Sequence, residues 1–391
     1  MTHTLLVSAV GTTIGIDLSA LDEGDAAAVR AAWADASVDT SVDTGEAVTT
    51  VTPGGGTRAS MLMRLSQQVT LAAIEAGRKE LWMLHAAGVA TERGDVVVFV
   101  GPSGRGKTTA SRALGQRFGY LSDETIGIEL DGRVRVYRKP LSIIEDPAQP
   151  KVERAPSSIG LLPVPDAELR VRAIVLLDRQ PEHDGAPVVT EVDLGDALAE
   201  LVAQTSYLPD LEAPLRFIAA VAQATGGIRS VIYREAVDLP GIIPGLVAGD
   251  AVTPVMTDAA PPEPSNAHAI ATGKEPRYMR VTPRDELALQ HPDRVAVLTV
   301  DEHSRGTVHV IAGIAPALWR AAEGSTLAEL TEAAIAAYGE PPIETRGQVS
   351  HPAEATVRAA LDDLRAGGLL VTTWDDPEDV QDVHPDETGQ E

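Results

Sequence analysis

The hydrophobic pattern of residues 1–251 changes repeatedly between strict alternation and a period of three to four residues, which predicts a mixed α/β region. Its strongest signal is the apolar run Val96–Val100, which we expect to be a buried strand. The preceding run, Leu81–Ala90, is predicted to be a second strand that joins it in a hairpin. Further helices are expected at Ala26–Ala36, Ala59–Lys79, Lys107–Phe118, Asp196–Gln204, Pro214–Ala224 and Leu239–Val247, and further strands within Thr4–Ile16, Tyr120–Leu130, Arg133–Tyr137, Arg170–Leu177 and Ile228–Tyr233.

The pattern also divides the chain into regions. Residues 1–80 are expected to form an N-terminal α+β region, and residues 81–251 an α/β domain with hairpins. Residues 252–276 are rich in Pro, Ala, Thr and Ser without periodicity, which is typical of a flexible linker. Residues 277–374 then show a hairpin, three helices and a short strand, the order of a winged-helix domain, and the acidic tail 375–391 is expected to be disordered. The expected elements of this last domain are Val295–Val300, Thr307–Ala312, Ala315–Ala322, Leu327–Tyr338, Pro352–Ala366 and Leu369–Thr372.

Charge and cysteine content exclude several classes of partner and binding site. The formal net charge is −25, which argues against nucleic acid as a partner because phosphate backbones bind basic surfaces. The chain has no cysteine, so disulfides and thiolate metal sites are excluded. No apolar stretch is long enough to span a membrane, and no secretion signal is visible. We therefore expect a cytoplasmic protein without a membrane partner.

The strand Val96–Val100 runs into Gly-Pro-Ser-Gly-Arg-Gly-Lys-Thr-Thr, a Walker A sequence between a strand and a helix. Its glycines let backbone N–H groups surround phosphate oxygens, and the helix adds its positive end. Lys107 is expected to reach the β- and γ-phosphates, and the Thr108 hydroxyl to bind Mg²⁺. ATP and Mg²⁺ are thus the expected cofactors. The residues expected to bind the nucleotide are Gly101, Ser103, Gly104, Arg105, Gly106, Lys107, Thr108 and Thr109.

Two further features lie close to this loop in sequence. Asp123 and Glu124 follow Lys107 by 16 and 17 residues, so a helix and a turn could bring them back beside the loop. One carboxylate could hold Mg²⁺, and the other could accept a proton from an attacking hydroxyl. His85 precedes Gly101 by 16 residues, on a strand expected to neighbour the loop strand. The alternatives are a solvated acidic turn and an ordinary core histidine.

In order and spacing, His85, the loop Gly101–Thr108 and the pair Asp123-Glu124 resemble the HPr serine kinase and phosphoenolpyruvate carboxykinase-like group. The resemblance covers about residues 80–180. It implies a P-loop kinase fold, phosphoryl transfer to a hydroxyl with Asp123 as base and a metal near Thr108, Asp123 and Glu124, and a homo-oligomer. The loop ends Lys-Thr-Thr where HPr kinases have Lys-Ser-Glu, and no Leu-Glu-Val-Arg-Gly-type segment is found. These departures argue against a phosphorylase activity and against HPr as substrate.

The segment Arg138-Lys139-Pro140-Leu141 supplies two adjacent cations, which could neutralise transferring phosphate oxygens or simply end a solvated strand. A similar segment recurs in HPr-kinase-like proteins of peptide-modification clusters, so we include Arg138 and Lys139 among the candidate catalytic residues. Arg172 and Asp178 flank another strand, and we expect both to be structural, with Arg172 as a weak candidate.

Residues 280–373 resemble the PqqD-like domain that recognises leader peptides of ribosomally made, modified peptides. The matching segments are Ala296–Leu298, Thr307–Gly313, Ala317–Trp319, Thr326–Leu330 and Ala360–Leu370. The resemblance implies that a leader peptide adds a strand to the hairpin edge, beside the third helix. We therefore expect a kinase that phosphorylates a Ser or Thr hydroxyl of a precursor peptide recruited through its leader. The alternatives are an ATP-binding peptide presenter without transfer, a small-molecule kinase acting, for example, on free serine, and, for this domain, a DNA-binding winged helix.

Overall fold

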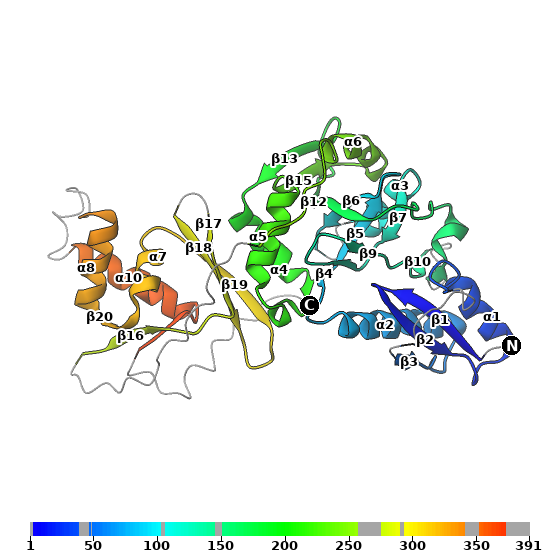
Figure 1. The fold of residues 1–391 in the computed structure, drawn as a ribbon, viewed down its shortest axis with the longest axis horizontal. Helices are drawn as coiled ribbons and strands as arrows, with labels where there is room; N and C mark the ends of the chain where they lie inside the picture. The colour runs from blue at the N-terminus through cyan, green and yellow to red at the C-terminus, as the bar shows by residue number, and fades with distance from the viewer. Residues whose placement is uncertain are drawn as a thin grey trace. The chain divides into compact units, whose positions relative to one another are not determined.

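The computed structural model describes residues 3–38, 47, 49–102, 106–144, 151–256, 275–289, 293–340 and 352–372. The chain divides into two compact units, Met1–Thr257 and Asp258–Glu391 (Figure 1). Ser103, Gly104 and Arg105 of the loop, most of the expected linker and the whole acidic tail lie outside the described residues.

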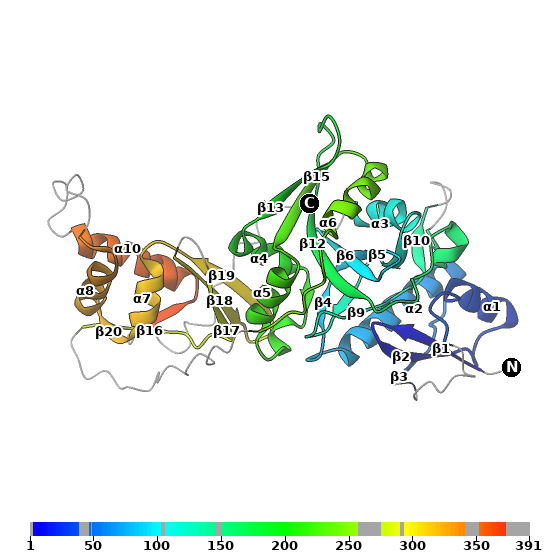
Figure 2. The same cartoon turned by 45° about the horizontal axis from the view of Figure 1, so that its top comes forward.

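The centre of unit 1 is a six-stranded sheet whose order brings the predicted site together (Figure 2). The middle strands β12, β15 and β6 are parallel, whereas β5 runs antiparallel to both β6 and β7. The carboxyl ends of β6, β7, β12 and β15 and the amino end of β5 therefore meet at one end of the sheet, which we call the loop end. In spatial order the strands are β13 (Val188–Val192), β15 (Ile228–Tyr233), β12 (Arg170–Arg179), β6 (Asp95–Val100), β5 (Ala86–Ala90) and β7 (Gly119–Ser122).

Helices cover this sheet because its strands are apolar on both faces. Five of the six residues of β6 are buried, as expected for a central strand. One face packs against α3 (Lys107–Gly115), the 3₁₀ helix η3 (Ala236–Ile242) and α6 (Ile243–Leu246), which share a core with the sheet. The helix predicted at Leu239–Val247 is thus part 3₁₀ and part α, since Pro240 cannot donate the hydrogen bond that an α-helix needs. The remaining α-helices between residues 81 and 251 are α4 (Leu194–Ala203) and α5 (Pro214–Ala224), and α5 contacts β12.

A second sheet has the order β14 (Thr205–Ser206), β4 (Trp82–Leu84), β8 (Ile126–Ile128) and β9 (Val134–Arg135). Its existence corrects two predictions, because the single strands expected at Leu81–Ala90 and Tyr120–Leu130 are each broken into two. Each of these two chain segments runs from one sheet into the other. Leu84, just before the first break, pairs with Ile126, just after the second break. In the second break, the Ser122 hydroxyl accepts the N–H groups of Glu124 and Thr125, both at 3.2 Å, and closes a turn.

The N-terminal part packs onto this second sheet. The α2 helix begins at its N-cap Thr57 and buries one side along its whole length, including Leu65 and Val69. Its core also contains Leu81, Met83 and Tyr137, so residues on both sides of position 80 share one core. The remaining elements of unit 1 are β1 (Thr4–Ala9), β2 (Thr12–Asp17), α1 (Glu23–Ala32), β3 (Thr49–Val51), α2 (Arg58–Ala76), β10 (Leu141–Ile143), β11 (Val152–Arg154), η1 (Pro156–Ile159) and η2 (Leu208–Asp210).

Unit 2 contains the predicted hairpin and helices together with strands that the pattern did not predict. The hairpin β18–β19 gains a third strand, β17, and the last strand β21 joins a separate sheet of order β20-β16-β21. The winged-helix and PqqD-like assignments therefore stay predictions. The elements are β16 (Arg277–Arg280), β17 (Asp285–Leu289), β18 (Arg294–Val300), β19 (Gly306–Ile311), α7 (Ala315–Ala321), β20 (Glu323–Thr326), α8 (Leu327–Tyr338), α10 (Pro352–Ala366) and β21 (Leu370–Thr372).

Within the described parts of both units, no helix combines the length and the apolar character that a membrane crossing requires.

Candidate active site

Three predicted site segments meet at the loop end of the main sheet. Gly101 follows β6, His85 directly precedes β5, and Asp123 directly follows β7. Because β5 lies between β6 and β7 and runs in the opposite direction, its amino end lies beside their carboxyl ends. The sheet therefore places the start of the phosphate loop, the histidine and the acidic pair on one side of the molecule.

The described part of the loop has the backbone and charge that a phosphate site needs. Gly106 is the N-cap of α3 with φ of 90°, a left-handed conformation that favours glycine. Lys107 is buried, and its Nζ donates a hydrogen bond to the Gly101 carbonyl at 2.5 Å. Burial lowers the pKa of Lys107, and the carboxylates of Glu200 and Asp123 partly oppose this. Thr108 and Thr109 are exposed in the first turn of α3.

The acidic pair is held by a buried lysine. Lys139 Nζ lies 2.9 Å from Glu124 Oε2 and 3.8 Å from Asp123 Oδ1. Burial alone would lower the pKa of Lys139, but the two carboxylates outweigh it and raise the pKa above its usual value. The buried Tyr120 hydroxyl donates to Asp123 Oδ1 at 3.1 Å. Asp123 is thus oriented by a tyrosine, and Lys139 is the counter-ion of the pair.

His85 is not on the face of a strand, as the sequence suggested, but in the bend between β4 and β5. Its backbone N–H donates to the Gln204 carbonyl at 2.7 Å. Burial lowers the pKa of His85, and the positive charge of Lys107 lowers it further, although the nearby Glu124 and Asp123 oppose both effects. His85 is therefore neutral near pH 7 and lies within electrostatic range of the loop lysine and the acidic pair.

Arg138 is held by backbone carbonyls rather than by the acidic pair. Its Nη1 donates to the carbonyls of Tyr120 and Leu162 at 2.6 and 2.8 Å, and its Nη2 lies 3.5 Å from Asp35 Oδ2. These contacts favour a structural role over the catalytic one considered from the sequence.

Arg172 is likewise tied to backbone carbonyls, those of Gly249 and Asp250, near the end of β12 that is remote from the loop end. Asp178 lies at the loop end and accepts a hydrogen bond from Gln180 Nε2 at 2.6 Å.

Sequence reasoning missed two acidic residues near the site. Glu153 on β11 is buried, and its Oε2 has no hydrogen-bond partner in the part of the chain that the structure describes. Burial raises the pKa of Glu153, and the positive charge of Lys139 opposes this. Glu200 on α4 affects Lys107, as described above. A three-residue strand and an ordinary amphipathic helix gave no signal that would have singled out either residue.

Mg²⁺ fits the residues present. No three His, Asp or Glu side chains lie close enough to hold a metal by themselves, within the part of the chain that the structure describes. Mg²⁺ in nucleotide sites is commonly held by one or two carboxylates, with phosphate oxygens and water completing its octahedron. Asp123, Glu124 and the exposed Thr108 hydroxyl can supply those protein ligands.

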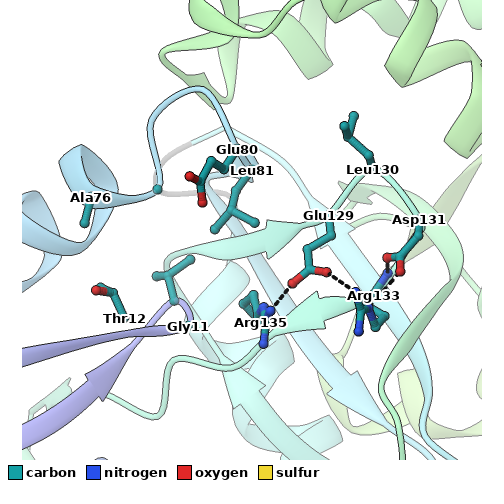
Figure 3. Close-up of a pocket in the computed structure, with 12 residues that line it drawn as sticks. Gly11, Thr12, Ala76, Glu80, Leu81, Glu129, Leu130, Asp131, Arg133 and Arg135 are labelled. Carbon is teal, nitrogen blue, oxygen red and sulfur yellow. Dashed lines mark hydrogen bonds and ion pairs between the residues drawn. The ribbon is translucent and has the colours of Figure 1, made fainter. Parts of the chain in front are cut away.

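The cavities described in unit 1 do not contain these residues. One, of about 680 Å³, lies at the far end of β4 and β8 from the acidic pair, where Glu129 bridges Arg133 and Arg135 (Figure 3). The other, of about 820 Å³, is lined by Thr91, Arg93 and Asp95, at the end of β5 and β6 remote from the loop end. The residues predicted to bind a triphosphate therefore line neither of these two cavities.

The chain was compared with known proteins. No protein-family model matches it, and no curated protein matches it. Among solved structures, it is similar to the Hpr(Ser) kinase/phosphatase from Coxiella burnetii, with 14% sequence identity, over 42% of this chain and 93% of that chain. The TM-score of 0.23 is low, so this likeness by itself assigns neither a fold nor an activity to the chain.

Proposed function

We propose that the chain is a kinase that transfers the γ-phosphoryl group of ATP to a Ser or Thr hydroxyl of a ribosomally made precursor peptide. One observation carries the proposal: β5, β6 and β7 bring His85, the phosphate loop and the acidic pair to the same end of the sheet. A triphosphate on the loop is then flanked by carboxylates that suit a metal and a base.

Each side chain has a separate role in the transfer. Asp123, oriented by Tyr120, accepts the proton of the acceptor hydroxyl. The hydroxyl oxygen bonds to the γ-phosphorus while the bond from that phosphorus to the β–γ bridging oxygen breaks, and ADP leaves with the electron pair. Lys107 neutralises negative charge on the phosphates, and neutral His85 can hydrogen-bond the acceptor or the moving group. When bound, Mg²⁺ adds positive charge at the phosphate oxygens.

Unit 2 supplies the peptide site in this proposal. Among its described residues, β19 pairs only with β18, so its other edge is open to an added strand. His309 on β19 lies against the turn that ends α10, because a Cβ placed on Gly367 would be 3.7 Å from its Nδ1. An extended leader segment could therefore lie along β19 and beside α10.

The test is incubation of the full chain with ATP, Mg²⁺ and the precursor peptide encoded beside its gene, followed by mass analysis of the peptide. We expect a phosphopeptide with the wild type and none with Lys107→Ala or Asp123→Asn. Lys107→Ala should also lose nucleotide, whereas Asp123→Asn should keep it.

The same assay separates the alternatives. Leader binding and nucleotide binding without any phosphopeptide would favour a peptide presenter. A truncated chain of residues 1–257 that phosphorylates free serine as fast as the full chain would favour a small-molecule kinase. Either result would contradict the proposed peptide kinase.

A further inference from the structure

The two cations predicted beside the site, Arg138 and Lys139, already interact with other groups of the protein. Arg138 is held by two backbone carbonyls, and Lys139 by the acidic pair. In the described part of the loop, the remaining cation is Lys107, whose Nζ already donates one hydrogen bond to the Gly101 carbonyl. A triphosphate in such a site needs further donors, because its oxygens lose water on binding.

Tyr233 offers one such donor. It is the last residue of β15, is only 1% exposed, and its hydroxyl has no hydrogen-bond partner among the described residues. A Cβ built on Gly106 would lie 3.5 Å from the Tyr233 hydroxyl oxygen, so this group adjoins the phosphate-binding turn. Burial raises the pKa of Tyr233, which keeps the hydroxyl protonated as a donor. A buried hydroxyl without a partner is costly, and a ligand oxygen would remove that cost.

Arg179 offers a second donor for the triphosphate. It is the last residue of β12 and pairs in register with Tyr233. A Cβ on Gly106 would lie 3.7 Å from Arg179 Cδ, and the Nε donates to the Arg234 carbonyl at 3.1 Å. The side chain is exposed, and its two terminal nitrogens have no hydrogen-bond partner among the described residues. The hydrogen bond of Nε holds the aliphatic part of the Arg179 side chain in place, and the terminal nitrogens remain available to bind a ligand.

We propose that Arg179 and Tyr233 bind the phosphates of the nucleotide, from the side of the loop opposite to Asp123. This rests on the proposed function, in which the loop holds a triphosphate. The strand order gives the two sides: β12 and β15 lie on one side of β6, and β5 and β7 lie on the other. The guanidinium pairs with a phosphate oxygen, and the tyrosine hydroxyl donates to another.

The experiment measures the equilibrium affinity of the full chain for Mg²⁺–ATP and for inorganic tripolyphosphate, which has no nucleoside. Charge-assisted hydrogen bonds contribute enough that Arg179→Ala should weaken both affinities about 10- to 100-fold. Arg179→Lys should recover part of the loss, since it keeps the charge but not the fork of donors. Tyr233→Phe should weaken both affinities about 3- to 10-fold.

Two controls distinguish this role from a structural one. Arg234→Ala removes a neighbouring exposed arginine that lies 4.0 Å from Glu235, and both affinities should stay unchanged. The melting temperature of unliganded Tyr233→Phe should equal or exceed that of the wild type, because the substitution removes an unsatisfied buried hydroxyl.

The outcomes separate this inference from the proposed function. Unchanged affinities in Arg179→Ala and Tyr233→Phe, with binding lost in Lys107→Ala, would overturn the inference and leave the kinase proposal standing. Loss of ATP affinity with tripolyphosphate unaffected would also overturn it, because the contact would then be to the nucleoside. A wild type that binds neither probe would overturn both.

Discussion

The buried ion pairs around Lys139 allow a quantitative test of the site. Substitution Lys139→Met keeps the volume of the side chain and removes its charge. The Lys139 Nζ is 2.9 Å from Glu124 and 3.8 Å from Asp123, so each attraction is about 4–6 kcal/mol at an effective dielectric constant of about 20. The burial of the ammonium group offsets much of this gain. Loss of one partner of a buried pair typically costs about 3–5 kcal/mol, because the remaining charge stays buried.

The side chain of Glu124 is 35% exposed, so water screens part of its interaction, and we expect a loss near the lower end, about 3 kcal/mol. The measurement is urea unfolding of residues 1–257, a unit with its own cores. The matched control is Lys151→Met, which removes an exposed lysine and should change stability by less than about 0.5 kcal/mol.

Mg²⁺ and a second substitution make the test specific. With Lys139 absent, Mg²⁺ should stabilise the variant more than the wild type, since the cation can replace the lost charge between the carboxylates. Adding Glu124→Gln to Lys139→Met should recover part of the lost stability. A variant as stable as the wild type, or one that gains no more from Mg²⁺, would refute Lys139 as the counter-ion.

Three further predictions follow from single residues. Arg138→Met should lower the unfolding free energy by about 2 kcal/mol, because it leaves buried carbonyls unpaired, yet leave the nucleotide affinity unchanged; a loss of turnover at unchanged stability would contradict the structural role. Gly106→Ala should cost about 1 kcal/mol of stability, because φ is 90°, and should weaken ATP binding at least tenfold, as a nucleotide titration would show; wild-type affinity would contradict the tight turn. The lowered pKa of His85 means that the folded state resists its protonation, so wild-type stability should begin to fall as pH drops below the histidine value of 6.5. His85→Gln should lose less stability between pH 7.5 and pH 5.5, as urea unfolding at each pH would show, and parallel losses would contradict the assignment.

The sequence predicted a helix or strand well where the whole element lies in one environment. The helix at Pro214–Ala224 and the strand at Ile228–Tyr233 begin and end where predicted. Seven residues of α5 are buried at helical spacing, and β15 is buried at Ile228, Val231 and Tyr233, so no change of environment interrupts either pattern. The strands on either side of His85 and Asp123 were predicted as single strands because a change of sheet leaves both halves buried, and burial alone shows no break.

The charged residues of the site show more clearly what could not be predicted from the sequence. Arg138 and Lys139 were chosen because two adjacent cations stood out in an acidic chain, but adjacency along a chain says nothing of the direction of each side chain. The structure turns Arg138 toward backbone carbonyls and Lys139 toward the acidic pair. Arg179 and Tyr233 gave no motif, because their place at the loop end depends on the parallel pairing of β12 with both β6 and β15.

The strand order also sets how far Arg179 and Asp123 lie from the loop strand. Neighbouring strands lie about 4.8 Å apart, so β12 brings Arg179 within one strand spacing of the loop strand. The reversed strand β5 separates β6 from β7, so Asp123 lies about two spacings, or about 10 Å, from the loop strand. The nearer position suits a group that binds phosphates already on the loop. In the proposed transfer, the farther position leaves room for a phosphoryl group and an incoming hydroxyl between the loop and Asp123, with His85 just before the strand between them. Without the reversed strand, the proposed base would lie about one strand spacing, or about 5 Å, from the loop strand, which leaves less room for an acceptor hydroxyl.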